Sequence, residues 1–230
     1  MTEQESLIII NPNPSQSVTV GVYSDLNRLR LCGIPIRCLT LSGSRTGFEN
    51  QKQADLTVTS MLSPAEQQKD AAGCVIGFFG NLGLHSLCDR TPSPVVGIQE
   101  AAVITTLNLC QRFGNIVIMP KSIPRQLRYF GAMGVLDRLA RDPTLGLGLA
   151  DLADRDKNLS AMIAKGLQLR DEDGTNVLIM GSARMTHYNS ILDDFTGLPL
   201  VEPYRTAVSL ALGQIVLNLS HKSGNKIHAR

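Results

Sequence analysis

Three short sequence patterns occur twice in this chain of 230 residues, and they occur in the same order. The runs IIINPNPS, VIGFFG and PVVGIQEAAV are similar to the later runs VIMPKSIP, LIMGSA and PLVEPYRTAV. The matched positions are Pro12 with Pro120, Gly77 with Gly181, and Pro94 with Pro199. Their offsets are 120 − 12 = 108, 181 − 77 = 104 and 199 − 94 = 105 residues. Three pairs in register at nearly constant spacing indicate a duplicated fold.

Apolar runs alternate with helical segments along the chain, and continuous Ile, Val and Leu runs are typical of buried parallel strands. The expected strands are 7–10, 34–41, 74–79, 94–98, 115–120, 176–182 and 198–203. The expected helices include 99–113, which would end at Gly114, parts of 122–142, and the segments 157–174 and 204–221. We therefore predict an α/β fold with two pseudo-symmetric lobes, each a mainly parallel sheet flanked by helices.

The duplication also predicts where the lobes begin and where a ligand binds. Residues 1–100 with 208–230 would form the first α/β lobe, and residues 101–207 the second. Ligands of open parallel sheets bind beyond the carboxyl ends of the strands. If two similar lobes face each other, the segments that follow their strands converge, so we expect the active site in the cleft between the lobes.

Charge and aromatic content argue against nucleic acid or a membrane as partner. The net charge is +2, aromatic residues make up 4% of the chain, and tryptophan is absent. A base-stacking platform needs more aromatic rings, and so small a charge attracts no polyanion. No segment approaches the roughly 20 apolar residues of a membrane helix. The N-terminal MTEQESLIIINP has no basic region of a signal peptide, so we expect a cytoplasmic protein that acts on a small-molecule substrate.

The five cysteines form no CxxC pair, and each lies in or beside an apolar run. This pattern predicts buried, reduced thiols in a cytosolic protein, and it disfavours a zinc site. The glycines at 77, 80 and 83 do not have the spacing of a dinucleotide-binding fingerprint. We therefore expect neither a metal nor a nucleotide cofactor.

Six motifs resemble, in order, the landmarks of the hydantoin and allantoin racemases of the aspartate/glutamate racemase superfamily. These motifs are INPNPS, GFFGNLGL, PVVGIQEAA, PKSIP, DGTNVLIMGSARM and GLPLVEP. The resemblance extends from about residue 7 to residue 212. It implies two pseudo-symmetric lobes with the active site between them, chemistry without a cofactor, and a homo-oligomer.

This chain differs from that family at the two positions that matter most for catalysis. In that family one cysteine removes a proton from the acidic carbon beside a carbonyl, and a second cysteine returns one. The first belongs to a pattern like A-C-F-G-x-x-G-L, where this chain has Phe78, and the second to G-C-A-G-M, where it has Ser182. Phenylalanine moves no proton, and serine needs an activating neighbour. Racemisation by two thiols is therefore excluded.

Other departures indicate a less polar site. Val117 and Ile118 stand where family members often have a threonine pair, and 202–205, Glu-Pro-Tyr-Arg, replaces a turn of small residues. We expect a substrate that is larger and more apolar than hydantoin or allantoin.

The candidate site residues follow predicted strands. Ser182 and His187 are the candidate catalytic residues, because an imidazole five residues beyond the serine can act as base or donor if the loop folds back. Arg184 and Lys121 suit an anionic group, and Tyr204 suits closure of the cleft or hydrogen-bond donation. The residues expected to bind the substrate are Asn11, Asn13, Phe78, Phe79, Gly80, Asn81, Lys121, Ser122, Ala183, Arg184 and Tyr204.

Three functions follow from these patterns. The first is a cofactor-independent enzyme that steers an isomerisation, cyclisation or lyase step on a small, rather apolar carbonyl compound. The second is an enzyme similar to arylmalonate decarboxylases, which keep only the second-lobe cysteine, with Ser182 in its place. The third is a binding protein that retains the cleft without catalysis.

Overall fold

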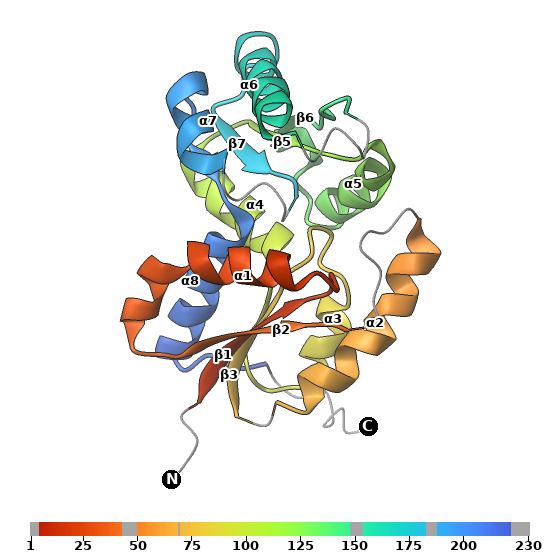
Figure 1. The fold of residues 1–230 in the computed structure, drawn as a ribbon, viewed down its shortest axis with the longest axis vertical. Coiled ribbons are helices and arrows are strands. Elements are labelled where there is room, and N and C mark those ends of the chain that lie inside the picture. Colours follow the sequence, from red (N-terminus) through yellow and green to blue (C-terminus); the bar gives the residue numbers. More distant parts are fainter. Residues whose placement is uncertain (1–4, 43–49, 69, 148–153, 183–187, 222–230) are drawn as a thin grey trace. The chain divides into compact units, whose positions relative to one another are not determined.

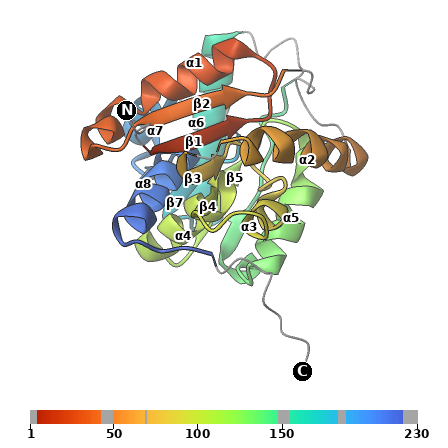
Figure 2. The same ribbon diagram turned by 90° about the horizontal axis from the view of Figure 1, so that it is seen from below.

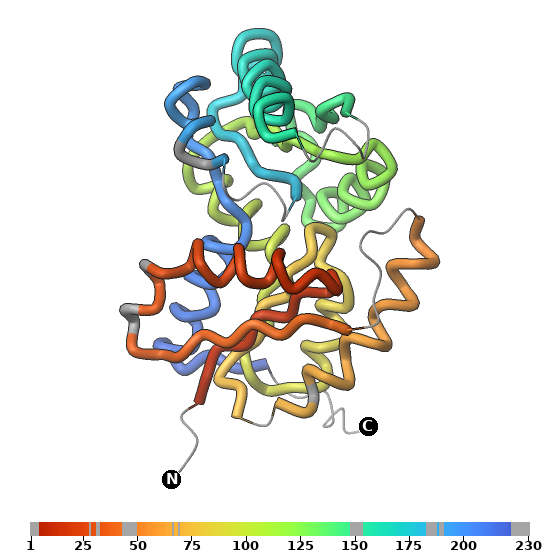
Figure 3. The backbone as a smooth tube through the Cα atoms, viewed as in Figure 1, coloured from red at the N-terminus to blue at the C-terminus, as the bar shows by residue number. Residues whose placement is uncertain are grey.

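The computed structural model describes residues 5–42, 50–68, 70–147, 154–182 and 188–221 (Figure 1). The chain forms two compact units, Met1–Glu100 with Tyr204–Arg230, and Ala101–Pro203. It passes into the second unit within α4 (Ile98–Leu109) and returns at the start of α8 (Pro203–Val216). The return therefore falls at Tyr204, where the sequence analysis placed it at residue 208. Figure 3 traces the backbone through both units.

The first unit contains a sheet of four parallel strands in the order β2-β1-β3-β4. These strands are β1 (Ser6–Asn11), β2 (Ile36–Thr40), β3 (Ala71–Ile76) and β4 (Val95–Gly97). The helices of this unit are α1 (Gln16–Asp25), η1 (Asn27–Cys32), α2 (Gln51–Glu66), α3 (Leu84–Cys88) and α8. Strands β1 and β3 are central, and β1 is fully buried, as its run of apolar residues predicts.

Helices cover both faces of this sheet. A Cβ on Gly73 would lie 3.1 Å from the Ile215 side chain of α8, so that face packs against α8. The next residue, Cys74, points to the opposite face and lines a cavity with Ala65 of α2 and Leu87 of α3. Helix α1 lies alongside β2, and Figure 2 shows this arrangement from below.

The second unit repeats this topology, with four parallel strands in the order β6-β5-β7-β8. Its strands are β5 (Phe113–Ile116), β6 (Leu139–Arg141), β7 (Val177–Met180) and β8 (Leu200–Val201). Its helices include η2 (Pro120–Ser122), α5 (Ile123–Ala132), η3 (Leu136–Arg138), α6 (Arg155–Asp171) and α7 (Asn189–Thr196). The Phe113 ring meets Phe130 of α5 on one face at 5.7 Å between centroids, and Leu169 of α6 covers Gly114 on the other.

The predicted duplication and fold class are confirmed by this common strand order and by equivalent hydrogen bonds. The Gly77 amide donates to the Ile10 carbonyl at 2.8 Å, and the Gly181 amide donates to the Ile116 carbonyl at 2.9 Å. The carbonyls of the paired Pro94 and Pro199 accept from Cys74 and Leu178, respectively. Gly77 and Gly181 therefore occupy equivalent places in the two sheets, and so do Pro94 and Pro199.

Several boundaries and one strand differ from the predictions, and the expected strands 74–79 and 115–120 are Ala71–Ile76 and Phe113–Ile116 in the structure. Helix α4 ends at Leu109 rather than beside Gly114, because Phe113 and Gly114 belong to β5. Phe113 is completely buried against Phe130, and this packing outweighs the helical periodicity of its segment. Strand β6 lies within 122–142, a stretch expected to be helical in parts, and its three residues are too few to show a period.

Among the described residues, no helix is long and apolar enough to cross a membrane.

Candidate functional site

The loop after β3 begins at Gly77 and turns tightly before α3. Gly80 has φ +125°, Asn81 has φ +46° and Gly83 has φ +69°, a region that glycine enters without steric cost. The Asn81 amide donates to the Phe78 carbonyl at 3.0 Å and so closes the turn. Phe78 is half-buried at the carboxyl end of the sheet, whereas Phe79 is buried.

The side chain of Asn81 anchors this loop. Its Oδ1 accepts from the Gln99 amide at 3.1 Å, and its Nδ2 is buried with no hydrogen-bond partner among the described residues. A Cβ on Gly97 would collide with the Asn81 side chain, so the glycine at the end of β4 admits this asparagine. Asn81 therefore joins the loop to the start of α4, and its predicted contact with a substrate stays a prediction.

Asn11 and Asn13 shape the segment between β1 and α1. The Asn11 Oδ1 accepts from the Asn13 amide, and the Asn13 Oδ1 accepts from the Ser15 amide, both at 2.9 Å. The Asn11 Nδ2 donates to the Thr19 hydroxyl at 2.9 Å. Asn11 is buried and holds the turn, whereas Asn13 is half-buried.

Tyr204 is 1% exposed within the first unit. Its hydroxyl donates to the Gly77 carbonyl at 2.9 Å, directly before Phe78. The hydroxyl is thus bonded to the backbone that carries the Phe78 loop. The roles expected of Tyr204 at the site, closure of the cleft or hydrogen-bond donation, stay predictions.

In the second unit, Lys121 and Ser122 follow β5 within η2, and Ser182 follows β7. Lys121 is exposed, while Ser122 and Ser182 are half-buried. The Ser122 hydroxyl donates to the Met119 carbonyl at 2.7 Å. Three other predicted site residues, Ala183, Arg184 and His187, lie outside the described residues.

Gln126 of α5 joins the two strand ends of the second unit. It is 1% exposed, and its Nε2 donates to the Gly181 carbonyl at 3.3 Å and to the Ser122 hydroxyl at 3.4 Å. Its Oε1 accepts from the Asn115 side-chain amide at 2.9 Å. The sequence analysis did not single out Gln126, whose position in an amphipathic helix gives no sign of burial.

Asn115 and Asp142 complete this buried polar cluster. The Asn115 Nδ2 also donates to Oδ1 of Asp142, which follows β6. Burial raises the pKa of Asp142 to about 7, although the hydrogen bond from Asn115 works against this shift. An asparagine inside the apolar run FGNIVIM was the one sequence signal that could have revealed the cluster.

None of the four described free cysteines lies at the predicted site positions, and burial raises the pKa of each thiol. The pKa of Cys38 is raised to about 11 and that of Cys74 to about 12. Both thiols therefore stay protonated near neutral pH and are poor bases.

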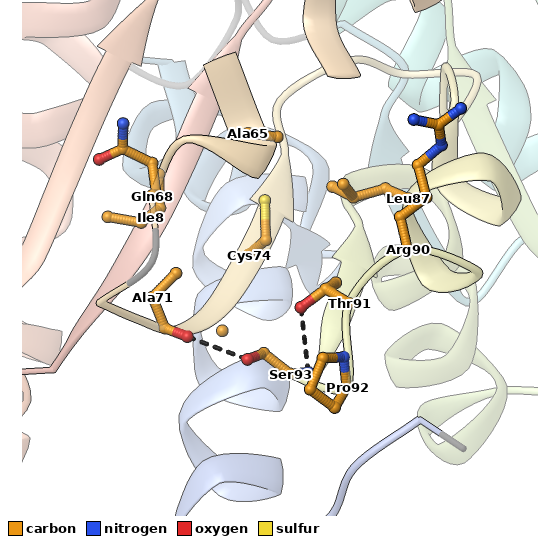
Figure 4. A pocket seen from close by; sticks show the side chains of 11 residues that line it. Ile8, Ala65, Gln68, Ala71, Cys74, Leu87, Arg90, Thr91, Pro92 and Ser93 are labelled. Atoms are coloured by element: carbon orange, nitrogen blue, oxygen red, sulfur yellow. Dashed lines mark hydrogen bonds between the residues drawn. The ribbon is translucent and has the colours of Figure 1, made fainter. Parts of the chain in front are cut away.

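Cys74 lies in a cavity of about 300 Å³ within the first unit, close to the amino ends of β1 and β3 (Figure 4). Ile8 and Leu87 contribute apolar walls, and Ser93 donates to the Ala71 carbonyl at its edge. Because Phe78 follows the opposite end of β3, this cavity is separate from the candidate site. Among the described residues, no group of three or more His, Cys, Asp or Glu side chains could hold a metal ion.

Two sheets of parallel strands in the same order, each with a glycine directly after a central strand, define a duplicated α/β protein. Residues 7–211 match the family model described as Asp/Glu/Hydantoin racemase, so the chain belongs to this family.

Known proteins of similar sequence and fold cover nearly the whole chain. A hydantoin racemase of Paenarthrobacter aurescens is 25% identical over 224 residues, which are 95% of this chain and 94% of the relative. The crystal structure of allantoin racemase from Pseudomonas fluorescens has a TM-score of 0.88 at 20% identity and covers 96% of this chain and 94% of its own. The structure of unliganded arylmalonate decarboxylase has a TM-score of 0.62 at 14% identity, with 99% and 96% covered. These structures share the fold of this chain.

Proposed function

We propose that this protein is a cofactor-independent enzyme that acts on a small, rather apolar carbonyl compound by a mechanism without a pair of cysteines. The observation that carries the proposal is the identity of the residues that directly follow Gly77 and Gly181. These are Phe78 and Ser182, which stand at equivalent strand ends, where the family motifs have cysteines. The chain belongs to the racemase family but has neither thiol at these positions.

The described thiols give no substitute for the missing pair. Cys74 lies within β3 rather than beyond it, and its pKa of about 12 keeps it neutral. We assign proton transfer to Ser182, which stands where the second family cysteine is expected, and we propose that His187, five residues later, activates it. Phe78 adds apolar surface, which suits a substrate with an alkyl or aryl substituent.

We propose that residues directly beyond strand ends bind the substrate. We assign Asn13, Lys121 and Arg184 to polar groups of the substrate and Phe78 to its apolar part. Correct orientation alone lowers a reaction barrier by several kcal/mol, so a site without a strong base still supports catalysis.

Arylmalonate decarboxylation is a second candidate function. It is favoured by the shared fold and by the apolar Phe78 beyond the end of β3. Loss of carbon dioxide from a disubstituted malonate leaves an enediolate, which takes up one proton. In this reading Ser182 stands at the position of the proton donor. New carbon dioxide release from aryl malonates by a Ser182→Cys variant would favour this candidate.

Exchange in deuterium oxide tests the main proposal. The protein is incubated with racemic hydantoins that carry alkyl or aryl substituents, and incorporation of deuterium at the acidic carbon is followed by proton NMR together with product formation. We expect turnover that falls at least about 100-fold in Ser182→Ala, the usual size of a lost acid–base group. Ser160→Ala, exposed on α6, is the matched control and should retain turnover.

Two outcomes would overturn the proposal. Full turnover in Ser182→Ala, His187→Ala and Lys121→Ala would show that the chemistry uses other residues. Saturable binding of these compounds without exchange or product would show a binding protein instead of an enzyme.

A further inference from the structure

In both units, a buried side chain donates a hydrogen bond to the carbonyl of the glycine that precedes the candidate site position. The Tyr204 hydroxyl donates to the Gly77 carbonyl at 2.9 Å, and the Gln126 Nε2 donates to the Gly181 carbonyl at 3.3 Å. Tyr204 and Gln126 are each 1% exposed. The two donors differ in chemistry and come from different helices, yet they bind equivalent atoms of the duplicated fold.

In both units, a side chain larger than glycine at this position would collide with its neighbours. A Cβ on Gly77 would lie 2.6 Å from the Tyr204 hydroxyl oxygen, and a Cβ on Gly181 would lie 2.6 Å from Asn115 Oδ1. Each glycine amide also donates to the neighbouring strand, at Ile10 or Ile116. The backbone is therefore held on both sides of each glycine.

We propose that Tyr204 and Gln126 are positioning residues, which fix the peptides that carry Phe78 and Ser182, respectively. This inference rests on the proposed function, which assigns roles in the reaction to positions 78 and 182. The carbonyl of a glycine and the amide of the next residue lie in one rigid peptide plane, and in a trans peptide they point in opposite directions. A donor that holds the carbonyl therefore also sets the direction of the following amide and the start of the loop.

Asn115 determines which end of the Gln126 side chain faces Gly181. Its Nδ2 donates to Gln126 Oε1, so the Gln126 Nε2 is left to point toward the Gly181 carbonyl. The same Nδ2 donates to Asp142, which anchors Asn115 to the end of β6. The ends of three neighbouring strands are thereby linked through α5.

This cluster is more polar than packing alone requires. Asn115 Oδ1 and Asp142 Oδ2 are buried without a hydrogen-bond partner among the described residues. Burying such atoms costs free energy that apolar side chains of similar size would avoid. A role in directing Gln126 accounts for a polar cluster in this place.

Cysteine reporters at the two positions test the proposal without any need for turnover. Phe78→Cys and Ser182→Cys are prepared separately, and the rate of alkylation by iodoacetamide is measured for each new thiol by peptide mass spectrometry between pH 6 and pH 9. Each reporter is then combined with Tyr204→Phe or with Gln126→Met. Peptides that contain Cys74 and Cys88 serve as internal standards, and thermal unfolding checks that each variant is folded.

We expect the loss of each hydrogen bond to change the alkylation rate of only that reporter cysteine which follows the affected glycine. The reason is that the reactivity of a thiol depends on its local environment. Tyr204→Phe should change the alkylation rate at position 78 by about threefold or more, and Gln126→Met should do so at position 182. The other reporter should stay unchanged in each case. Tyr188→Phe, which removes another buried tyrosine hydroxyl bonded to a backbone carbonyl, is the control for the first reporter. Gln168→Met on α6 is the control for the second.

Unchanged alkylation rates at both reporter cysteines would overturn the proposal. An equal change at both reporters in each variant would also overturn it, because it would indicate that the whole fold has become less rigid.

If Gln126→Met does not fold, Gln126→Glu replaces it. A protonated glutamate donates to the Gly181 carbonyl and an ionised one does not, so the difference from the parent should grow as pH rises. A pH-independent difference would contradict the proposal. Failure of the deuterium exchange test would leave these measurements intact, so the two proposals fail separately.

Discussion

Asp142 is a buried carboxylic acid in the polar cluster of the second unit, and its environment favours the neutral form. Burial raises its pKa from the ordinary value of 3.8 to about 7, while the donated hydrogen bond from Asn115 opposes the shift. Between these two values, the unfolded chain releases the proton and the folded protein retains it. The folded state therefore loses stability as pH rises from about 4 to about 7.

Asp142→Asn should remove this pH dependence, because the amide oxygen still accepts from Asn115 and carries no charge. We expect the variant to be more stable than the parent at pH 8, by about 2–4 kcal/mol, and nearly equal to it below pH 4. Urea unfolding at pH 4 and pH 8 measures the difference. Asp137→Asn, at an exposed position of η3, is the control. Equal stability of parent and variant at pH 8 would contradict the burial of a neutral acid.

Gly181 shows the cost of a single methyl group at the candidate site. A Cβ there would lie 2.6 Å from Asn115 Oδ1 and 2.7 Å from the Ile116 carbonyl oxygen, and the backbone oxygen cannot move away. We expect Gly181→Ala to destabilise the protein by about 1–3 kcal/mol in chemical unfolding. At Gly213, inside α8, a Cβ meets nothing within 4 Å among the described residues. Gly213→Ala should be neutral or stabilising, by about 1 kcal/mol at most, and a similar loss in both variants would argue against a specific clash.

At the scale of helices and strands, local chemistry explains where several elements begin. The Asn50 side chain accepts from the Gln53 amide at 3.0 Å at the start of α2, and Asp154 does the same for two amides at the start of α6. Such caps satisfy amide groups that have no partner within the helix. Strand β6 and the end of α4 depend instead on packing, and both differ from the prediction made from the sequence.

The cap of α2 provides a test at this scale. Asn50→Ala should reduce the free energy of unfolding by about 0.5–2 kcal/mol, because the Gln53 amide loses its acceptor. Ser15 has the corresponding position before α1, but within the described part of the chain its side chain makes no cap hydrogen bond. Ser15→Ala should therefore have the smaller effect in the same urea titration. An equal loss in both variants would show that the Asn50 contact contributes nothing special.

At the scale of the whole molecule, the duplication places equivalent strands at the centre of each sheet. Strands β1 and β3 are central in the first unit, and β5 and β7 are central in the second. The glycines that directly follow β3 and β7 donate to the neighbouring central strand in both units. The two units therefore share not only a strand order but also the backbone pattern that surrounds the candidate site.

Hydrogen exchange should reflect this equivalence. The amides of Gly77 and Gly181 should exchange among the slowest groups of their units, because opening them requires the central strands to separate. Amides of the edge strands β2 and β6 should exchange faster, by about tenfold or more. Exchange measured by NMR or by mass spectrometry of peptides checks this order. Fast exchange at either glycine would show that its strand end opens independently of the core.

The sequence by itself determined the duplication and the two parallel sheets. These features are local, because apolar runs and the glycines and prolines that bound them can be read within a few residues. The tertiary structure alone revealed what holds the candidate positions. Gln126 and Gly181 are 55 residues apart in the chain, and Tyr204 and Gly77 are 127 apart. No local pattern joins such residues, since their hydrogen bonds form only when distant segments pack around the same buried carbonyl groups.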